Sequence, residues 1–322
     1  MGLWQVNADT MAGSRFVVSA AAEASACMFA LHKGRARNPG ERVWLDAHSP
    51  AYEARLAGDP ITALLLRAAW GNHWIADFLT PTPPSDDAPD FSDEIDRIRR
   101  TPPDVVHADL EVSLRGSLPA ALRRDDLAER AAGLLEWVWA ETVLPYWPRR
   151  RRVLEADIVA RTGQLGQRGW AAALDDMRPG MRWLGENRLQ INTLDYPPRD
   201  VTDARLMFVP VTPRMGWVSW SSDRRFSIVY PCSGVLAEPG AGQVPDALAR
   251  LLGGGRAAVL MLLGSPKSTS HLVALTGQGL GSVGRHLKVL LDAGLVQRRR
   301  SGRSVLYYRT DAGEVLVAAQ AR

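Results

Sequence analysis

Three glycines near the C-terminal end have the spacing of a phosphate-binding loop. Gly279, Gly281 and Gly284 form the pattern G-x-G-x-x-G within GLGSVGRHLKVLLDAGLVQRRR, and a helical pattern follows them. Glycines at this spacing let a backbone approach the pyrophosphate of a dinucleotide at the N-terminus of a helix. The same stretch also fits the second helix of a helix-turn-helix, whose exposed side chains would meet DNA. The two alternatives predict a cofactor-binding enzyme or a DNA-binding protein.

The surrounding sequence favours the DNA-binding alternative. A dinucleotide site needs a buried strand before the glycines and an acidic residue about 20 positions after them. The stretch HLVALT could be such a strand, but Arg299 stands where the acid is expected. We expect the 38 residues after Gly284 not to supply the further βα units of such a fold. No parallel sheet that begins with this fingerprint is indicated upstream.

Short helices are expected throughout this C-terminal part. They cover PDALARLL, GRAAVLMLLG, STSHLVALTG and LGSVGRHLKVLLDAG. The apolar positions of the last helix recur at three and four residues and are Val283, Leu287, Leu290 and Leu291. Ser282, Arg285 and Lys288 fall on the other side, where they could meet base edges and phosphates. Gly294 is expected to end the helix, as a C-terminal cap glycine does.

A basic β-hairpin is predicted after this helix. In LVQRRRSGRSVLYYRT, two strand-like runs flank a short turn, and a hairpin that follows a helix-turn-helix is a wing. The predicted DNA-contacting arginines of the hairpin are Arg298, Arg299, Arg300 and Arg303. Guanidinium groups in such a position neutralise phosphates or enter the minor groove.

These residues carry a family resemblance. RHLKVLLDAGLV, followed by RRRSGRSVLYYRT, resembles the ArsR-type winged-helix transcription regulators over about Val244–Arg322. The usual family pattern runs close to S-T-V-S-R-H-L-K-V-L-x-x-A-G-L-V, then a basic hairpin and a closing helix. The resemblance implies binding to double-stranded DNA as a homodimer. It also implies that helices around Ala247–Leu252 and Gly313–Ala319 supply the two-fold interface.

Two features depart from the family pattern. Gly281 and Gly284 occupy recognition-helix positions that are commonly serine, and glycine offers no side chain to a base. Many metal sensors of the family carry C-x-C before the recognition helix, where this sequence has Ser268 and Ser270, followed by His271. Because thiolates bind soft metals, we expect no metal site and no cofactor, and we expect Ser268 or Ser270 to cap a helix.

Charge is distributed unevenly along the chain. From Val244 onward there are eleven Lys/Arg and four Asp/Glu, a net of +7, whereas the preceding residues have 28 basic and 31 acidic side chains, a net of −3. This asymmetry favours a polyanionic partner for the C-terminal part. We expect no membrane span and no export signal, and the two distant cysteines indicate reduced thiols in a cytoplasmic protein.

The long N-terminal part is expected to be mainly helical. Residues from about Arg15 to Arg182 show helical patterns broken by proline clusters, and short strand-like runs of a small sheet follow from about Asn187. The predicted fold class is therefore mainly α with small β elements (α+β). Residues 13–238 are expected to form an effector-binding domain and residues 239–322 a winged helix-turn-helix. The Gly- and Pro-rich stretch Leu236–Ala247 is the predicted linker.

The N-terminal part also carries a looser resemblance. RFVVSAAAEASACMFALH (Arg15–His32), WIADFLTP (Trp74–Pro81) and YPCSG (Tyr230–Gly234) resemble an uncharacterised domain that precedes winged helices in actinobacterial regulators. That resemblance implies no particular ligand.

All 11 tryptophans lie in this N-terminal part. Trp70, Trp74 and Phe78 recur at i, i+4 and i+8, which predicts one aromatic helical face, and His73 and Asp77 beside it are expected to be a surface pair. Two interpretations stay open: a well-packed core, or a pocket for a small apolar or planar effector. The effector-contacting candidates are Trp70, Trp74, Phe78 and Trp137.

The sequence therefore predicts a DNA-binding transcription regulator, a homodimer controlled by a small-molecule effector and not by a metal. The alternatives are an enzyme or a protein-interaction module that carries a winged-helix appendage. Sequence patterns of common catalytic sites, namely G-x-S-x-G, H-E-x-x-H, a Walker loop and C-x-x-C, do not occur, so we expect no enzyme.

Overall fold

The chain divides into two compact units. The first comprises residues 1–37, 41–148 and 161–232, and the second comprises residues 38–40, 149–160 and 233–322. The computed structural model describes residues 2–36, 39–71, 74–83, 90–175, 177–194, 196–221, 223–232, 244–264, 266–276, 278–301 and 304–319. Much of the predicted linker, up to residue 243, lies outside these ranges. Within them, no helix is long and apolar enough to cross a membrane.

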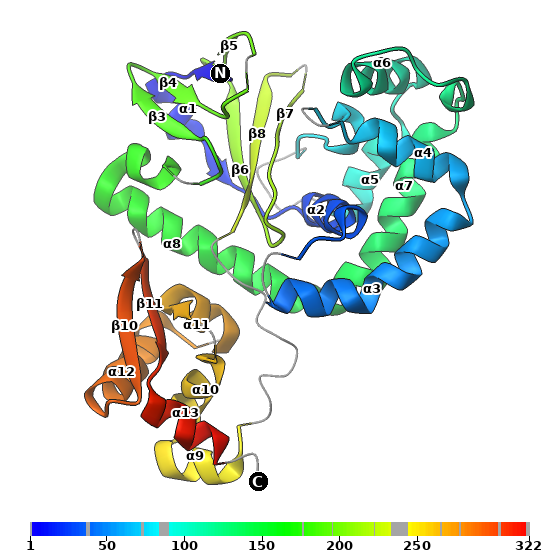
Figure 1. The fold of residues 1–322 in the computed structure, drawn as a ribbon. Coiled ribbons are helices and arrows are strands. Elements are labelled where there is room, and N and C mark those ends of the chain that lie inside the picture. The colour runs from blue at the N-terminus through cyan, green and yellow to red at the C-terminus, as the bar shows by residue number, and fades with distance from the viewer. Residues whose placement is uncertain are drawn as a thin grey trace. The chain divides into compact units, whose positions relative to one another are not determined.

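Two four-stranded sheets form one half of the first unit (Figure 1). Strand β1 (Leu3–Gln5) pairs antiparallel with β4 (Arg188–Gln190) and parallel with β5 (Arg199–Asp200), and β3 (Arg182–Gly185) continues the sheet beyond β4. In the second sheet β2 (Arg15–Phe16), β6 (Arg205–Val211) and β8 (Arg225–Pro231) run parallel, and β7 (Val218–Trp220) closes one edge antiparallel to β8.

Both faces of the second sheet are buried. Met207, Val209 and Val229 pack on one face with Ala26 of helix α2 (Ala20–Lys33). Phe208 and Tyr230 alternate to the other face, where they join residues of β1 and β4 and the end of α8 in a second cluster. Because both faces are covered, β6 and β8 are almost continuously apolar.

The expectation of one small sheet after residue 187 is therefore incomplete. Strands β1 and β2 and the helix between them, α1 (Ala8–Gly13), belong to the same packed unit. Strands of two or three residues are too short to show an alternation of apolar and polar side chains, so the sequence pattern did not reveal them.

Helices form the other half of the first unit, as the sequence predicts. Helix α2 packs there against helices and short turns that share one apolar cluster. They are α3 (Pro39–Ala57), α4 (Pro60–Ala69), η1 (Asp77–Leu79), α5 (Phe91–Arg99), α6 (Pro103–Leu114), η2 (Ala120–Leu122) and α7 (Leu127–Val138). The chain continues through a π-helical turn (Trp139–Val143), a short 3-10 turn (Leu144–Tyr146) and α8 (Trp147–Leu174), which is kinked at Gly169.

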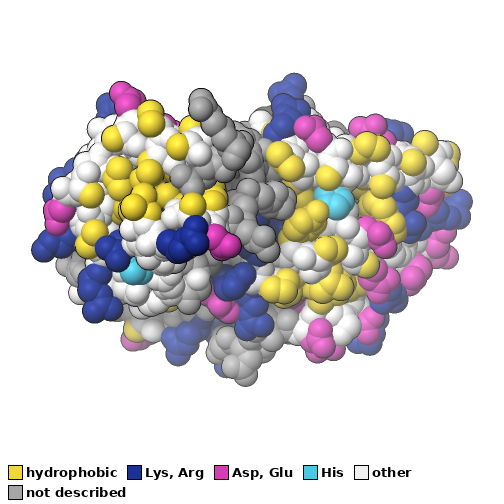
Figure 2. All heavy atoms as spheres, turned by 90° about the horizontal axis from the view of Figure 1, so that it is seen from below, with side chains coloured by type: hydrophobic (Ala, Val, Ile, Leu, Met, Phe, Trp, Pro, Cys, Tyr) yellow, Lys and Arg dark blue, Asp and Glu magenta, His cyan; other side chains and the backbone are white. Residues whose placement is uncertain are grey.

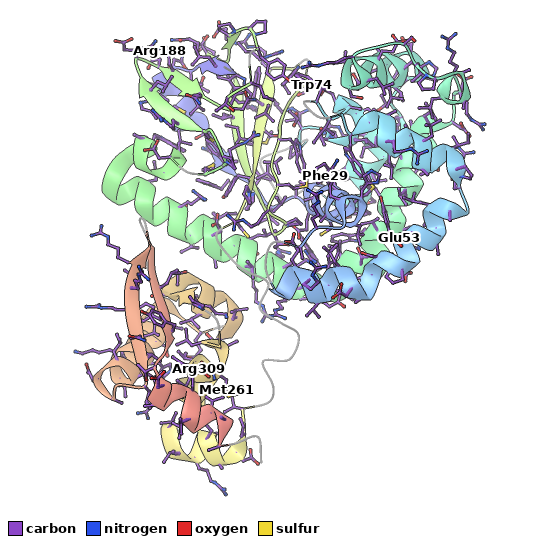
Figure 3. All side chains as sticks on the ribbon, in the orientation of Figure 1. Phe29, Glu53, Trp74, Arg188, Met261 and Arg309 are labelled. Carbon is purple, nitrogen blue, oxygen red and sulfur yellow. The ribbon has the colours of Figure 1, made fainter. Side chains whose placement is uncertain are left out.

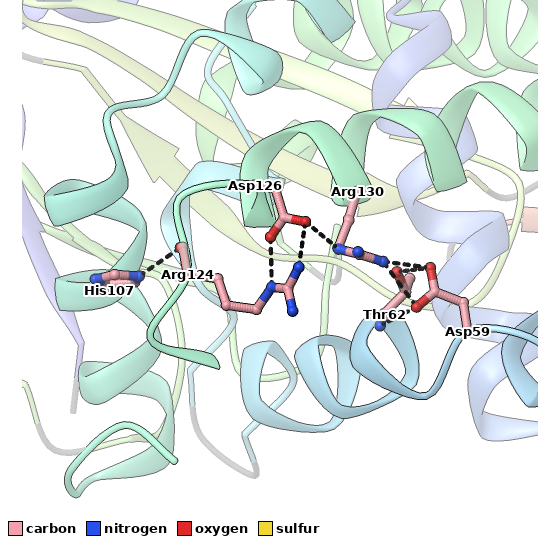
Figure 4. A network of polar contacts seen from close by, with 6 residues as sticks. All are labelled: Asp59, Thr62, His107, Arg124, Asp126 and Arg130. Carbon is pink, nitrogen blue, oxygen red and sulfur yellow. Dashed lines mark hydrogen bonds and ion pairs between the residues drawn. The ribbon is translucent and has the colours of Figure 1, made fainter. Parts of the chain in front are cut away.

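A polar network ties the N-terminus of α4 to that of α7 (Figure 4). Asp59 caps α4 by accepting the backbone N–H of Thr62 at 3.1 Å, and Arg130 of α7 donates to the same carboxylate at 2.9 and 3.0 Å. Arg130 also donates to Asp126, to which Arg124 donates two hydrogen bonds. Hydrogen bonds from Arg124 and Arg130 lower the pKa of Asp126. The network is partly exposed, so its effect is to orient the two helix starts more than to stabilise them.

Helix α2 begins at a buried carboxyl group. Ser19 caps the helix by accepting the N–H of Ala22 at 2.9 Å, and its hydroxyl donates to Glu94 of α5 at 2.8 Å. Glu94 also accepts the N–H of Ala21 at 3.3 Å and is 1% exposed. Burial raises the pKa of Glu94 to about 7, against the lowering effects of Ser19, Ala21 and Arg97.

Replacing Glu94 with glutamine should make stability less dependent on pH. The folded protein holds the Glu94 proton more tightly than the unfolded chain, so wild-type stability falls as pH rises from about 4.5 to 7. By this linkage the ionised carboxylate costs the fold roughly 3 kcal/mol at pH 8. Glu94→Gln should therefore unfold at a higher urea concentration than wild type at pH 8, and this advantage should shrink towards pH 5. An equal difference at both pH values would contradict the assignment.

Candidate nucleic-acid interface

The second unit contains a winged helix-turn-helix. Its helices are α9 (Asp246–Leu252), α10 (Gly254–Leu262), α11 (Thr269–Thr276), α12 (Leu280–Asp292) and α13 (Asp311–Ala318). Strands β10 (Val296–Ser301) and β11 (Ser304–Arg309) form the predicted hairpin, and β9 (Lys267–Ser268) pairs with β11. The four predicted helices and the hairpin are confirmed. HLVALT forms helix α11 and not a strand, so the dinucleotide alternative loses its required first element.

Three of the four residues in the predicted apolar stripe of α12 are buried, and the fourth, Leu291, is half-buried against the same cluster. Val283, Leu287 and Leu290 are at most 2% exposed and pack in one cluster with residues of α10, α11 and β10. In the same helix Arg285 and Lys288 are exposed. Burial of one stripe thus sets the direction in which both cationic side chains point.

The exposed face of α12 has little side-chain bulk near its start. A Cβ atom added at Gly281 or Gly284 would meet nothing within 4 Å, so neither glycine is required by packing within the described residues. Leu280, 60% exposed, lies at the start of the helix. The sequence prediction does not include Leu280, although its position outside the buried stripe indicates an exposed side chain. An exposed apolar side chain there suits contact with a thymine methyl group.

Ser282 is less exposed to solvent than Arg285 and Lys288. Its side chain is half-buried, and its hydroxyl lies 3.2 Å from Gln278 Oε1 and 3.4 Å from His286 Nε2. The geometry therefore favours a role in positioning the first turn of α12 over contact with a base.

The hairpin arginines point to both sides of the wing. Arg298, Arg299 and Arg300 are exposed and pair with Tyr307, Leu306 and Val305 of β11. Alternation along a strand places Arg298 and Arg300 on one face and Arg299 on the other. Arg303 lies outside the described residues, so its predicted contact stays a prediction.

The end of α12 is connected directly to the wing and to α13. Gly294 adopts φ +68°, and the N–H groups of Gly294 and Leu295 donate to Leu291 and Leu290, which forms a Schellman cap. Thr310, the N-cap of α13, donates its hydroxyl to the carbonyl of Gly294 at 2.6 Å. Helix α12, the hairpin and α13 therefore meet at one hydrogen-bonded junction.

The residues at the family's metal position do not form a thiolate site. Ser268 lies in β9, directly before α11, and pairs with Leu306. The side chains of Ser270 and His271 lie outside those that the structure describes. Across the described residues, no group of three or more His, Cys, Asp or Glu side chains is arranged to hold a metal ion.

The expectation that Trp70, Trp74 and Phe78 share one helical face is wrong. Helix α4 ends at Ala69, and Trp70 instead forms an isolated β-bridge with Ile75. A Cβ atom at Gly71 would lie 2.1 Å from the Ser113 carbonyl oxygen, so the chain turns here against α6. Spacing of i, i+4 aligns side chains only where the backbone continues as a helix.

The four effector candidates have different surroundings. Trp70 and Phe78 are 6% and 5% exposed in the helical core. Trp137 lies half-buried at the edge of that core, with its ring centroid 6.4 Å from that of Tyr52. Trp74 is half-buried and packs instead against Tyr196 and Trp220.

Replacing Gly284 with alanine should stabilise the second unit. Alanine is favoured over glycine by about 1 kcal/mol within a helix, and space for the methyl group is open. Gly313→Ala is the matched control: its Cβ would lie 2.1 Å from the Leu295 carbonyl oxygen, so this variant should be destabilised. Thermal unfolding of the full chain, followed by circular dichroism, would measure both. Equal behaviour of the two variants would contradict the packing described for α12 and α13.

Residues 256–298, from α10 into β10, match the family model described as bacterial regulatory protein, arsR family. No curated protein and no solved structure matches the chain. The matched segment contains the buried stripe of α12, its two exposed cationic residues and the first strand of the wing. The C-terminal unit thus contains a regulator domain of the arsR family.

Proposed function

We propose that this protein regulates transcription as a homodimer whose binding to double-stranded DNA is controlled by a small-molecule effector in the first unit. The observation that carries the proposal is the arsR-family match over a helix that exposes Arg285 and Lys288. DNA-binding regulation follows from the domain itself. The dimer, the docking geometry and the effector are the finer parts of the proposal.

In the proposed complex, α12 enters the major groove. Arg285 is the side chain best suited to a bidentate contact with guanine, and Lys288 to a phosphate. The arginines of β10 contact the backbone or the minor groove beside it. Because Gly281 and Gly284 carry no side chains, the backbone of α12 can approach the DNA closely at these two positions, and readout there depends on DNA shape.

Two recognition helices are needed to read a pair of half-sites about one DNA turn, roughly 34 Å, apart. We propose that α9 and α13 form the two-fold interface. Leu251 of α9 and Val315 of α13 are 65% and 70% exposed, and large apolar side chains are favoured at contacts between subunits. Figure 2 shows hydrophobic side chains gathered on one face of the second unit.

Substitutions in α12 and in the wing should have different effects on DNA binding. Arg285→Ala should weaken binding to the preferred sequence by about 1–3 kcal/mol and reduce discrimination against random DNA. Arg300→Ala should weaken binding to all sequences similarly and lower the salt slope by about 1, because one phosphate contact is lost. Fluorescence anisotropy with the full chain and DNA from upstream of its gene, at two salt concentrations, measures both effects.

Arg123→Ala is the control for loss of one positive charge, since Arg123 is exposed in the first unit. It should leave DNA binding unchanged. If Arg285→Ala and Arg300→Ala also left it unchanged, the proposed docking would be wrong. Binding to a protein partner that persists at high salt would instead support the interaction-module alternative.

A charge placed on α9 or α13 should prevent dimerisation. Leu251→Glu and Val315→Glu would each bury a carboxylate, with its symmetry mate, in the proposed interface, which is strongly unfavourable. Sedimentation velocity should show monomers for both variants and dimers for wild type. Val105→Glu, at an exposed apolar position of α6, is the matched control and should remain dimeric. Dimers of Leu251→Glu and Val315→Glu would place the interface elsewhere.

A further inference from the structure

A second group of aromatic residues lies where the helices and the sheets of the first unit meet. The ring of Trp74 is 5.4 Å from that of Tyr196 and 5.7 Å from that of Trp220, and both contacts are edge-to-face. All three rings are half-buried. Trp74, labelled in Figure 3, follows α4. Tyr196 precedes β5, and Trp220 ends β7.

One carboxyl group lies beside the ring of Trp74, and a second lies close to the first. Asp77, in η1, lies beside the indole of Trp74, and Asp109 of α6 accepts the backbone N–H of Phe78 at 2.8 Å. Asp77 is therefore not the surface residue that the sequence predicts, and His73 lies outside the described residues. Burial and the neighbouring Asp109 raise the pKa of Asp77 to about 7, and burial also raises the pKa of Asp109.

These two acids lack a strong counter-charge. Among the described residues neither carboxylate forms an ion pair, and Arg199 is the cation whose charge acts on Asp77. Two adjacent, partly buried carboxylates repel each other, so a cation that reaches both of them is favoured.

The protein itself shows which kind of cation the aromatic surface accepts. The guanidinium carbon of Arg199 lies 3.8 Å from the centroid of the Trp220 ring. This distance is that of a planar cation stacked on an aromatic face. Arg199 is exposed, so its side chain can leave the ring without opening a packed core.

We propose that Trp74, Tyr196, Trp220, Asp77 and Asp109 form the binding site of a planar organic cation that displaces Arg199 from Trp220. The ligand's flat face takes the place of the guanidinium, and its positive charge lies beside the two carboxylates. This inference rests on the proposed effector control and names the chemical class of the effector.

Benzamidine and benzamide test the inference as a matched pair, because they have nearly the same shape but only benzamidine is charged. Isothermal titration calorimetry with the full chain at pH 8 should show that benzamidine binds at least tenfold more tightly than benzamide. Asp77→Asn and Asp109→Asn should each weaken benzamidine binding roughly tenfold, as expected for loss of a charge-assisted hydrogen bond. Asp104→Asn, the same change at an exposed position of α6, should not.

Two further measurements separate binding from a general loss of folding. Arg199→Ala should tighten benzamidine binding, because the competing guanidinium is removed, whereas a purely structural role would weaken it. Binding to wild type should weaken roughly tenfold from pH 8 to pH 6, since the Asp77 carboxylate, beside Asp109 and Arg199, becomes protonated. Equal binding of the two compounds, or unchanged affinity in both Asp→Asn variants, would overturn the site.

The proposed effector control is tested separately by adding benzamidine to the DNA-binding assay. Binding that depends on Asp77 and Asp109 but leaves DNA affinity unchanged would support the site and contradict effector control through it. Failure of benzamidine to bind would overturn the site, while DNA binding measured without it would still test the regulator.

Discussion

Burial of one apolar stripe on α12 is the constraint on which the proposed interface depends. An α-helix has 3.6 residues per turn, so once Val283, Leu287 and Leu290 are packed against α10 and α11, the direction of every other side chain follows. Arg285 and Lys288 are exposed for this reason. The same geometry places Gly281 and Gly284 next to open space, so the helix backbone is uncovered by side chains at these two positions.

The residues that follow α12 connect it directly to the hairpin and to α13. The left-handed conformation of Gly294 reverses the chain, and Thr310 returns to its carbonyl before α13 begins. Gly313 then approaches the Leu295 carbonyl so closely that a side chain there would collide with it. Backbone hydrogen bonds from Leu295 to Leu290 and from Thr310 to Leu295, together with the Thr310 hydroxyl, therefore connect α12, the hairpin and α13 at one point.

The first unit places its polar groups under a different constraint. Its parallel strands are covered on both faces, so a buried carboxyl group such as Glu94 lies at a border between elements, where backbone N–H groups and hydroxyls can partner it. Glu94 has such partners at the start of α2. Asp77 and Asp109 have fewer, and Asp77 lies beside the half-buried ring of Trp74. That combination distinguishes a candidate ligand site from a structural cap.

Local sequence was sufficient to predict the helices and the hairpin of the second unit. Helix periodicity, the Gly294 cap and the alternation along the hairpin each depend on residues that are close in the chain. The helices of the first unit were likewise predictable. Tertiary structure alone decided where β1 and β2 pair, because two- and three-residue strands have no pattern of their own. It also decided that Trp74 packs against Tyr196 and Trp220 and not beside Trp70 and Phe78. The reason is that the chain turns at Gly71, close to the backbone carbonyl of Ser113, 42 residues away. Contacts between residues so distant in sequence are set by packing, which spacing cannot reveal.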